Sequence, residues 1–206
     1  MTRDWEKMIE LGRVTKPSEI YRGCGLRWWK EAQPWREYPH RHQRMLTTTE
    51  AHYIYRLAKE LGAGNYLNLG VFRGTSMACM AYGLQAIKAE GKVYGIDYFT
   101  YVPDMEKDVN EGMAATGLTG YIELCKGSTK EWAPKLKHLR FNATLIDADH
   151  SYEATKLDWE LYSPISKVMI FHDCDLGSVD KVISEINSRW ELIDHYWRLK
   201  AFRKKT

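Results

Sequence analysis

Residues Tyr66–Ser76 decide the fold, and they read Tyr-Leu-Asn-Leu-Gly-Val-Phe-Arg-Gly-Thr-Ser. A short apolar run ends at Gly70, Gly74 follows four residues later, and a segment of small residues with helical character begins there. This order predicts a strand, a tight turn and a helix start, because glycine allows positive φ and close approach of a ligand. The first amide groups of a helix attract polar ligand groups. The Gly-x-x-x-Gly spacing is not that of dinucleotide-binding proteins, so an ordinary strand–helix turn is the alternative.

Strand-like and helix-like patterns alternate along the chain. Thr47-Thr-Thr-Glu50 matches a capping box and opens a helical pattern that Gly62 and Gly64 end. Apolar runs predict strands at Tyr66–Leu69, Lys92–Ile96, Tyr121–Lys126, Ala143–Ile146 and Val168–Phe171. Helical spacing predicts helices at Thr75–Ala89, Pro103–Ala115, Lys130–Leu136, Tyr152–Tyr162 and Val179–Trp190. One or two further strands are expected within Leu192–Phe202, where no clear turn residue divides them.

This alternation is typical of right-handed crossovers and a parallel sheet. We therefore predict an α/β fold: a Rossmann-like, mainly parallel sheet of about seven strands with helices on both faces. The length of 206 residues fits one domain, spanning 45–206, with an irregular or partly helical N-terminal segment, 1–44, that covers the active site. The basic tail Arg198–Lys205 is expected to be a solvated end.

Composition and charge limit the functional classes. The net charge of +3 does not indicate sequence-independent binding to nucleic acid. The cysteines, Cys24, Cys79, Cys125 and Cys174, form no Cys-x-x-Cys pair, which argues against a zinc ribbon or a disulfide scaffold. No signal peptide and no membrane-length apolar run is visible, so a reduced, cytoplasmic protein is expected, and a homo-oligomer is compatible with the sequence.

Polar residues follow each of the five central predicted strands. Because the carboxyl ends of parallel strands meet at one edge of a sheet, these residues are expected to form one site. Asp97 ends the second strand, where a carboxylate can accept two hydrogen bonds from a ribose diol; the alternative is a helix cap or loop carboxylate.

Acidic and imidazole groups crowd the last two of these strand ends. Like charges at close range are costly, so this group needs a cation or a proton. Hard oxygen ligands suit Mg²⁺, and a histidine also admits Mn²⁺ or Zn²⁺. Capping and salt bridging without metal is the alternative. The residues concerned are Asp147, Asp149, His150, His172 and Asp173.

With these motifs in place, the chain resembles the class I S-adenosylmethionine-dependent methyltransferases, above all the macrocin-type and cephalosporin-hydroxylase-like small-molecule O-methyltransferases. The similarity runs from about Met45 to Trp190. Its most specific part is Leu-Ile-Asp-Ala-Asp-His-Ser-Tyr-Glu at 145–153, followed by Asp158 and by Phe-His-Asp at 171–173. The glycine turn and Gly-Ile-Asp97 supply the cofactor half of the motif.

The resemblance implies a role for each motif residue. Gly70, Gly74 and Ser76 would line the methionine and ribose side of S-adenosylmethionine, with Asp97 on the ribose hydroxyls and Ser128 near the adenine. Asp147, His172 and Asp173 would match the positions of a divalent metal, Mg²⁺ or Mn²⁺. His150 or Asp149 would match the general base. The chain departs from relatives at Asn68, a cofactor-binding position that is usually acidic, and at Ile165-Ser-Lys167, where Pro-Gly-Gly is usual.

Three functions compete at this point. The first is a metal-assisted O-methyltransferase for a small hydroxylated molecule, in which the metal would lower the pKa of the hydroxyl and His150 would take its proton. The second is a catalytically silent cofactor-binding domain, favoured by Asn68 and His172. The third is a nucleic-acid methyltransferase, which the low net charge and the lack of an Asn-Pro-Pro-Tyr motif disfavour.

Overall fold

A single seven-stranded sheet forms the centre of the protein in the computed structural model, which describes residues 46, 48–101 and 103–205. The strand order is β3-β2-β1-β4-β5-β7-β6, and the first five strands along the chain pair in parallel. The parallel strands are β1 (Asn65–Leu69), β2 (Val93–Asp97), β3 (Ile122–Lys126), β4 (Phe141–Ile146) and β5 (Ser166–Phe171). The antiparallel pair is β6 (Trp190–Tyr196) and β7 (Leu199–Lys204), with β7 beside β5.

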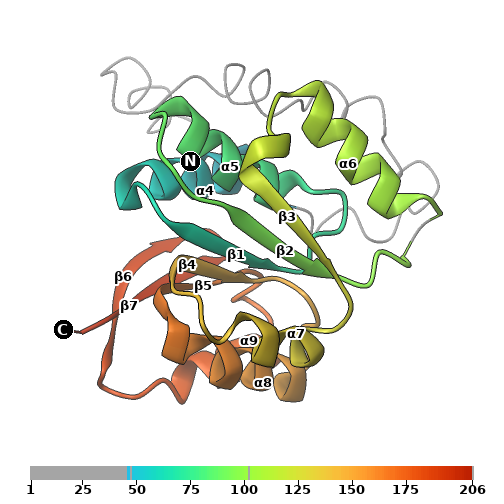
Figure 1. Cartoon of the computed structure of the whole chain (residues 1–206). Coiled ribbons are helices and arrows are strands. Elements are labelled where there is room, and N and C mark those ends of the chain that lie inside the picture. Colours follow the sequence, from blue (N-terminus) through green and yellow to red (C-terminus); the bar gives the residue numbers. More distant parts are fainter. Residues whose placement is uncertain (1–45, 47, 102, 206) are drawn as a thin grey trace.

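Helices cover both faces of this sheet (Figure 1). One face carries α4 (Thr48–Leu61), α5 (Thr75–Ala86) and α6 (Met105–Ala115), and the other carries α7 (Thr129–Leu136), α8 (Tyr152–Tyr162) and α9 (Gly177–Ser184). Two short 3₁₀ turns, η3 (Thr119–Tyr121) and η4 (Ser163–Ile165), precede β3 and β5. The predicted α/β class, the Rossmann-like sheet and its parallel centre are confirmed.

The sheet separates two hydrophobic cores. Met77, Met80 and Leu84 of α5 are fully buried in the first core, between the sheet and the helices α4–α6. The second core lies on the opposite face, where Trp159 of α8 stacks on Phe171 with ring centroids 5.7 Å apart. Because β4 and β5 are covered on both faces, all six residues of β4 are buried, as expected for a central parallel strand.

The register of the strands aligns their carboxyl ends. Leu69 pairs with Ile96 on one side and with Ile146 on the other, and Ile146 pairs with Phe171. The residues that follow these positions therefore emerge at one edge of the sheet, as the sequence predicted. This alignment brings together the glycine turn, Asp97 and the two acidic strand ends.

Several predicted boundaries were wrong. The helix expected at Thr75–Ala89 ends at Ala86, followed by Ile87 and by Lys88 at a positive φ of 52°. The helix expected at Val179–Trp190 ends at Ser184, and Trp190 instead begins β6. The segment Leu192–Phe202, where one or two strands were expected, belongs to a hairpin of β6 and β7 whose turn is Trp197-Arg198. The predicted N-terminal segment 1–44 lies outside the described residues. No helix within the described ranges is long and apolar enough to cross a membrane.

Candidate active site

The glycine turn after β1 has the predicted geometry. Gly70 and Gly74 both have a positive φ of 85°, and α5 begins directly after Gly74. A Cβ atom at Gly70 would lie 2.2 Å from the backbone oxygen of Asp147, so only glycine fits between β1 and the end of β4. The turn thereby approaches the acidic strand end through backbone contact.

Asp97 holds this turn in place. Its Oδ2 accepts hydrogen bonds from the backbone amides of Val71 (2.8 Å) and Phe72 (2.9 Å), and its Oδ1 accepts one from Phe99 (2.8 Å). A carboxylate has about four acceptor positions, so these three bonds leave capacity for one further donor. Asp97 therefore has the alternative role named for it, that of a loop carboxylate, and its contact with a ribose stays a prediction.

The other predicted cofactor residues lie along the same edge. Asn68 is fully buried at the end of β1; its Nδ2 donates to the Gly70 carbonyl, and its Oδ1 has no hydrogen-bond partner among the described residues. Ser76 is buried in the first turn of α5. Ser128 is the N-cap of α7 in a complete capping box with Glu131.

His172 lies in the middle of three carboxylates. Its Nδ1 is 3.0 Å from Asp147 Oδ1 and 3.5 Å from Asp173 Oδ2, while its Nε2 is 3.5 Å from Glu50 Oε2. Burial would lower the pKa of this imidazole, but the neighbouring carboxylates of Asp147, Asp173 and Glu50 raise it to about 12. The three surrounding carboxylates therefore favour the protonated form of His172.

Asp173 is buried directly after His172 and has a positive φ of 49°. Its Oδ1 accepts a hydrogen bond from Arg198 Nη1 at 2.7 Å, and its Oδ2 lies 3.1 Å from His150 Nε2. Burial would raise the pKa of this carboxyl, but the neighbouring His150 and His172 rings and the charge of Arg198 hold it well below its usual range. Asp173 is therefore ionised.

Two members of this cluster were missed by sequence reasoning. Glu50 is fully buried in α4 and accepts hydrogen bonds from Arg198 Nε (3.2 Å) and Nη2 (3.0 Å). The expectation that Arg198 belongs to a solvated tail was wrong, since this residue is 7% exposed in the β6–β7 turn. Glu50 was interpreted as part of a capping box, and Thr47, its expected partner there, lies outside the described residues. No local sequence signal distinguished these roles.

The two candidate bases have different surroundings. His150 is one-third exposed, and a hydrogen bond to Asp173 is the largest influence raising the pKa of its imidazole, against the opposing effect of burial. Its backbone carbonyl accepts a hydrogen bond from Ser178 of α9 at 2.6 Å. Asp149 is exposed, and its Oδ1 accepts the backbone amide of Ser151, the N-cap of α8. The structure thus couples His150, and not Asp149, to the buried cluster.

Three side chains at this edge of the sheet form a possible donor set for a divalent metal. Asp147, His150 and Asp173 each offer one ligand atom, and these atoms lie within 4.8 Å of one another. Two carboxylate oxygens and one imidazole nitrogen form a chemically suitable set for Mn²⁺ or Mg²⁺. This set differs from the predicted one, because His150 takes the place of His172.

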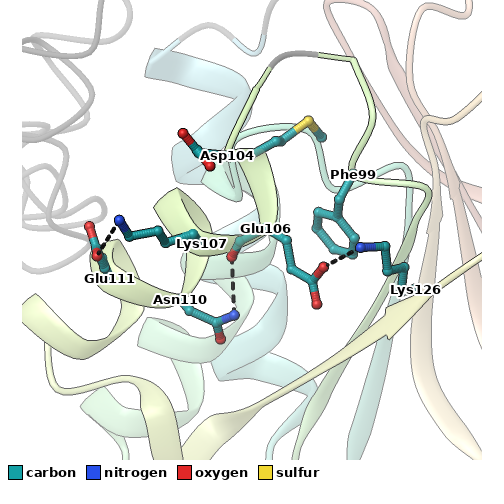
Figure 2. Close-up of a pocket in the computed structure, with 8 residues that line it drawn as sticks. Phe99, Asp104, Glu106, Lys107, Asn110, Glu111 and Lys126 are labelled. Atoms are coloured by element: carbon teal, nitrogen blue, oxygen red, sulfur yellow. Dashed lines mark hydrogen bonds and ion pairs between the residues drawn. The ribbon is translucent and has the colours of Figure 1, made fainter.

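A pocket borders the Asp97 end of the sheet edge. It lies between α6, the loop after β2 and the end of β3, and Phe99, Glu106 and Lys126 are among its lining residues. Figure 2 shows Glu106 and Lys126 pointing toward each other beside the Phe99 ring, with Lys126 Nζ 2.7 Å from Glu106 Oε2. Lys126 pairs in register with Asp97, so this pocket adjoins the predicted ribose position.

Comparison with known families decides the class of the protein. A family model described as "Methyltransferase domain" matches residues 67–174, which is more than half of the chain. The chain belongs to this methyltransferase family. The match includes the glycine turn, Asp97 and the Asp147–Asp173 cluster, so the predicted resemblance to class I S-adenosylmethionine-dependent methyltransferases is confirmed.

Solved structures confirm the methyltransferase fold. The O-methyltransferase TomG from Streptomyces achromogenes, involved in tomaymycin synthesis and bound to SAM, superposes with a TM-score of 0.70 at 15% identity, covering 87% of this chain and 89% of TomG. An O-methyltransferase from Bacillus cereus in complex with SAH has a TM-score of 0.68 at 15% identity, with coverage of 86% and 90%. The SAH-bound methyltransferase PaMTH1 from Podospora anserina has a TM-score of 0.64 at 16% identity, with coverage of 89% and 88%. No curated protein sequence matches this methyltransferase.

Proposed function

We propose that this methyltransferase transfers a methyl group from S-adenosylmethionine to a hydroxyl group of a small molecule, with His150 as the general base. The observation that carries the proposal is the contact between His150 Nε2 and the buried Asp173 Oδ2 at 3.1 Å, on a ring that keeps one-third of its surface exposed. A base needs both an orienting partner and access to substrate, and His150 has both.

The cofactor assignment is supported by the turn and by the related structures. TomG holds SAM, and the Bacillus cereus and Podospora anserina enzymes hold SAH. In this chain the donors and acceptors left for such a ligand are the first amides of α5, the remaining acceptor position of Asp97 and the unpartnered Asn68 Oδ1. An amide oxygen without a donor fits the amino group of the cofactor's methionine part, and Ser128 stays proposed for the adenine side.

The geometry assigns a direction to proton transfer. The 3.1 Å approach of His150 Nε2 to the Asp173 carboxylate supports a hydrogen on this nitrogen, and we propose Nδ1 as the basic atom. When bound, S-adenosylmethionine supplies a methyl group on a positively charged sulfur, and the protein aligns it with the acceptor. His150 Nδ1 accepts the hydroxyl proton, and Asp173 stabilises the resulting imidazolium.

A metal-assisted form is the second candidate, favoured by the spacing of Asp147, His150 and Asp173. A divalent metal held there would increase the acidity of the acceptor hydroxyl. His150 would then be a ligand, and Asp149 would be the remaining candidate base. We favour the first form, because Arg198 forms ion pairs with both buried carboxylates, Glu50 and Asp173, and His172 lies beside Asp147, so each carboxylate has a protein partner without a metal.

A small-molecule acceptor is supported by the O-methyltransferases among the similar solved structures, one of which is involved in tomaymycin synthesis. A nucleic-acid acceptor is disfavoured by the net charge of only +3. The competing idea of a silent binding domain predicts cofactor binding without turnover.

The test of the proposal measures binding and turnover together. Calorimetry with S-adenosylhomocysteine is expected to give a dissociation constant in the micromolar to sub-millimolar range, corresponding to roughly −5 to −8 kcal/mol. A panel of sugar and phenolic hydroxyl compounds, followed by mass spectrometry of S-adenosylhomocysteine and methylated product, identifies the acceptor class. Binding without turnover on any acceptor would favour the silent domain, and no binding at millimolar ligand would refute the cofactor assignment.

A further inference from the structure

We infer that Arg198 and Glu50 are positioning residues that fix Asp173 and, through it, the orientation of His150. The inference rests on the proposed function in giving His150 the role of base. Its structural content, a chain of buried contacts from α4 to the edge of the active site, is independent of the acceptor.

The chain of contacts is continuous and directional. Glu50 accepts two hydrogen bonds from Arg198, through Nε and Nη2, which fixes the plane of the guanidinium. The third nitrogen, Nη1, donates to Asp173 Oδ1 at 2.7 Å. With Oδ1 held in this way, Oδ2 is turned toward His150 Nε2.

The location of this series of contacts indicates a role in positioning the site, in addition to any role in stability. Asp173 adopts a left-handed backbone conformation, which costs free energy for a residue with a side chain and is found where a functional geometry is imposed. Arg198 supports that conformation from the backbone as well, because its carbonyl accepts the amide of Cys174 at 3.0 Å. Arg198 in the β6–β7 turn therefore holds two consecutive residues: Asp173 through its carboxylate and Cys174 through its backbone amide.

The planar fork of arginine is required by this arrangement. One guanidinium serves two carboxylates with three different nitrogens, which a lysine ammonium cannot do with the same fixed geometry. Replacement of Arg198 by lysine keeps the charge and relaxes the orientation, whereas replacement by methionine keeps only part of the volume. The two variants therefore separate charge from positioning.

The experiment compares Arg198→Met, Arg198→Lys and Glu50→Gln with a matched control, Lys200→Met. Lys200 lies two residues further along the same hairpin and makes an ion pair with Asp180, at 2.8 Å, that is separate from the Asp173 contacts described. Each variant is measured for kcat and KM, for S-adenosylhomocysteine affinity, and for the side-chain nitrogen NMR signals of His150, assigned with His150→Ala.

Arg198→Met is expected to lower kcat about 10²-fold, since a small misplacement of a catalytic group has that effect, with cofactor affinity within twofold of wild type. The NMR signals of His150 should shift away from the Nε2–H form. Arg198→Lys should have a kcat between those of Arg198→Met and wild type. Glu50→Gln should lower kcat several-fold, and Lys200→Met should have the kcat of the wild type.

A structural role alone would give a different result. Unchanged kcat and unchanged His150 signals in a folded Arg198→Met, with only a lower Tm, would overturn the inference. Should that variant fail to fold, Glu50→Gln decides by the same two measurements. The NMR signals also keep this test separate from the proposed function, because they report the orientation of His150 even in a protein without turnover.

Discussion

Asp97 Oδ2 accepts the backbone amide of Val71 at 2.8 Å, across 26 residues of sequence. The end of β2 is thereby tied to the glycine turn after β1, and the residue expected to bind the ribose also determines the shape of the turn. The proposed ribose contact therefore predicts that cofactor affinity and local stability are coupled at this position.

Substitution of Asp97 tests that coupling. Asp97→Ala is expected to weaken S-adenosylhomocysteine binding by about 1.5–3 kcal/mol and, unlike a pure ligand contact, to lower the free energy of unfolding as well, since three backbone amides lose their acceptor. Calorimetry and urea unfolding measure the two effects. Glu160→Gln is the control, because Glu160 is exposed on α8, on the opposite face of the sheet from α5. A loss of affinity with unchanged stability would show that the hydrogen bonds of Asp97 contribute nothing to stability.

His150→Ala is expected to lower the methyl-transfer rate about 10²–10⁴-fold with little change in cofactor affinity. The wild-type rate should fall as the pH drops through the pKa of His150, because the base must be neutral. Hydrogen bonding to Asp173 raises that pKa, so the fall begins at a higher pH than for an unperturbed histidine. Asp173→Asn should move this limb of the pH profile to lower pH. Asp149→Asn should cost less, and the reverse order of the two losses would make Asp149 the base.

Removal of metal separates the two forms of the site. In the favoured form the rate is unchanged in excess chelator, because Arg198 and His172 already serve as the partners of the carboxylates in the cluster. The alternative form predicts that chelator abolishes activity and that Mg²⁺ or Mn²⁺ restores it. Asp147→Asn should then have the same low rate as the wild type in chelator. Thermal unfolding with and without Mn²⁺ gives a second measurement, since a bound ion raises Tm whether or not it takes part in catalysis.

Asp158 gives a pH-dependent stability that can be measured apart from activity. Burial raises the pKa of this α8 carboxyl from 3.8 to about 6, against the opposing effect of a hydrogen bond from Thr129. A carboxyl whose pKa is raised in the folded state destabilises the protein when it ionises. Its ionisation therefore lowers the free energy of unfolding as the pH rises from about 4 to 6, and the loss is then constant. As the pH rises from 5 to 8, the free energy of unfolding of Asp158→Asn should therefore increase by about 1–2 kcal/mol relative to that of the wild type. Glu160→Gln, an exposed change on the same helix, should show no such gain.

The order of strands and helices followed from local sequence patterns. Residues 66–69 and 168–171 are apolar runs of strand length, and glycines or capping residues lie at several element boundaries, so the alternation and the parallel centre of the sheet could be predicted. Boundaries failed where local signals compete. Residues 185–189 continue the helical pattern of α9, but the chain leaves the helix at Ser184 to begin the strand at Trp190.

The candidate site was predicted as a neighbourhood, because parallel strands place their carboxyl ends at one edge whatever the rest of the chain does. Asp97, Asp147, His150 and Asp173 could be named for that reason. Their roles within the neighbourhood could not, since roles depend on which atoms meet. The sequence placed His172 among the metal ligands, which stays a prediction, and the structure shows that it lies among the carboxylates of Glu50, Asp147 and Asp173.

The sequence by itself determined the fold class, the glycine turn and the edge at which the chemistry gathers, because these depend on periodicity and on residues near one another in the chain. Only the tertiary structure decided the charge balance of the site. Arg198 and Glu50 are 148 positions apart, and their contact requires the terminal hairpin to pack beside β5 and near α4. A buried arginine can be recognised only when its carboxylates are in place, since the free energy of burying a charge depends on its partners and not on its sequence neighbours.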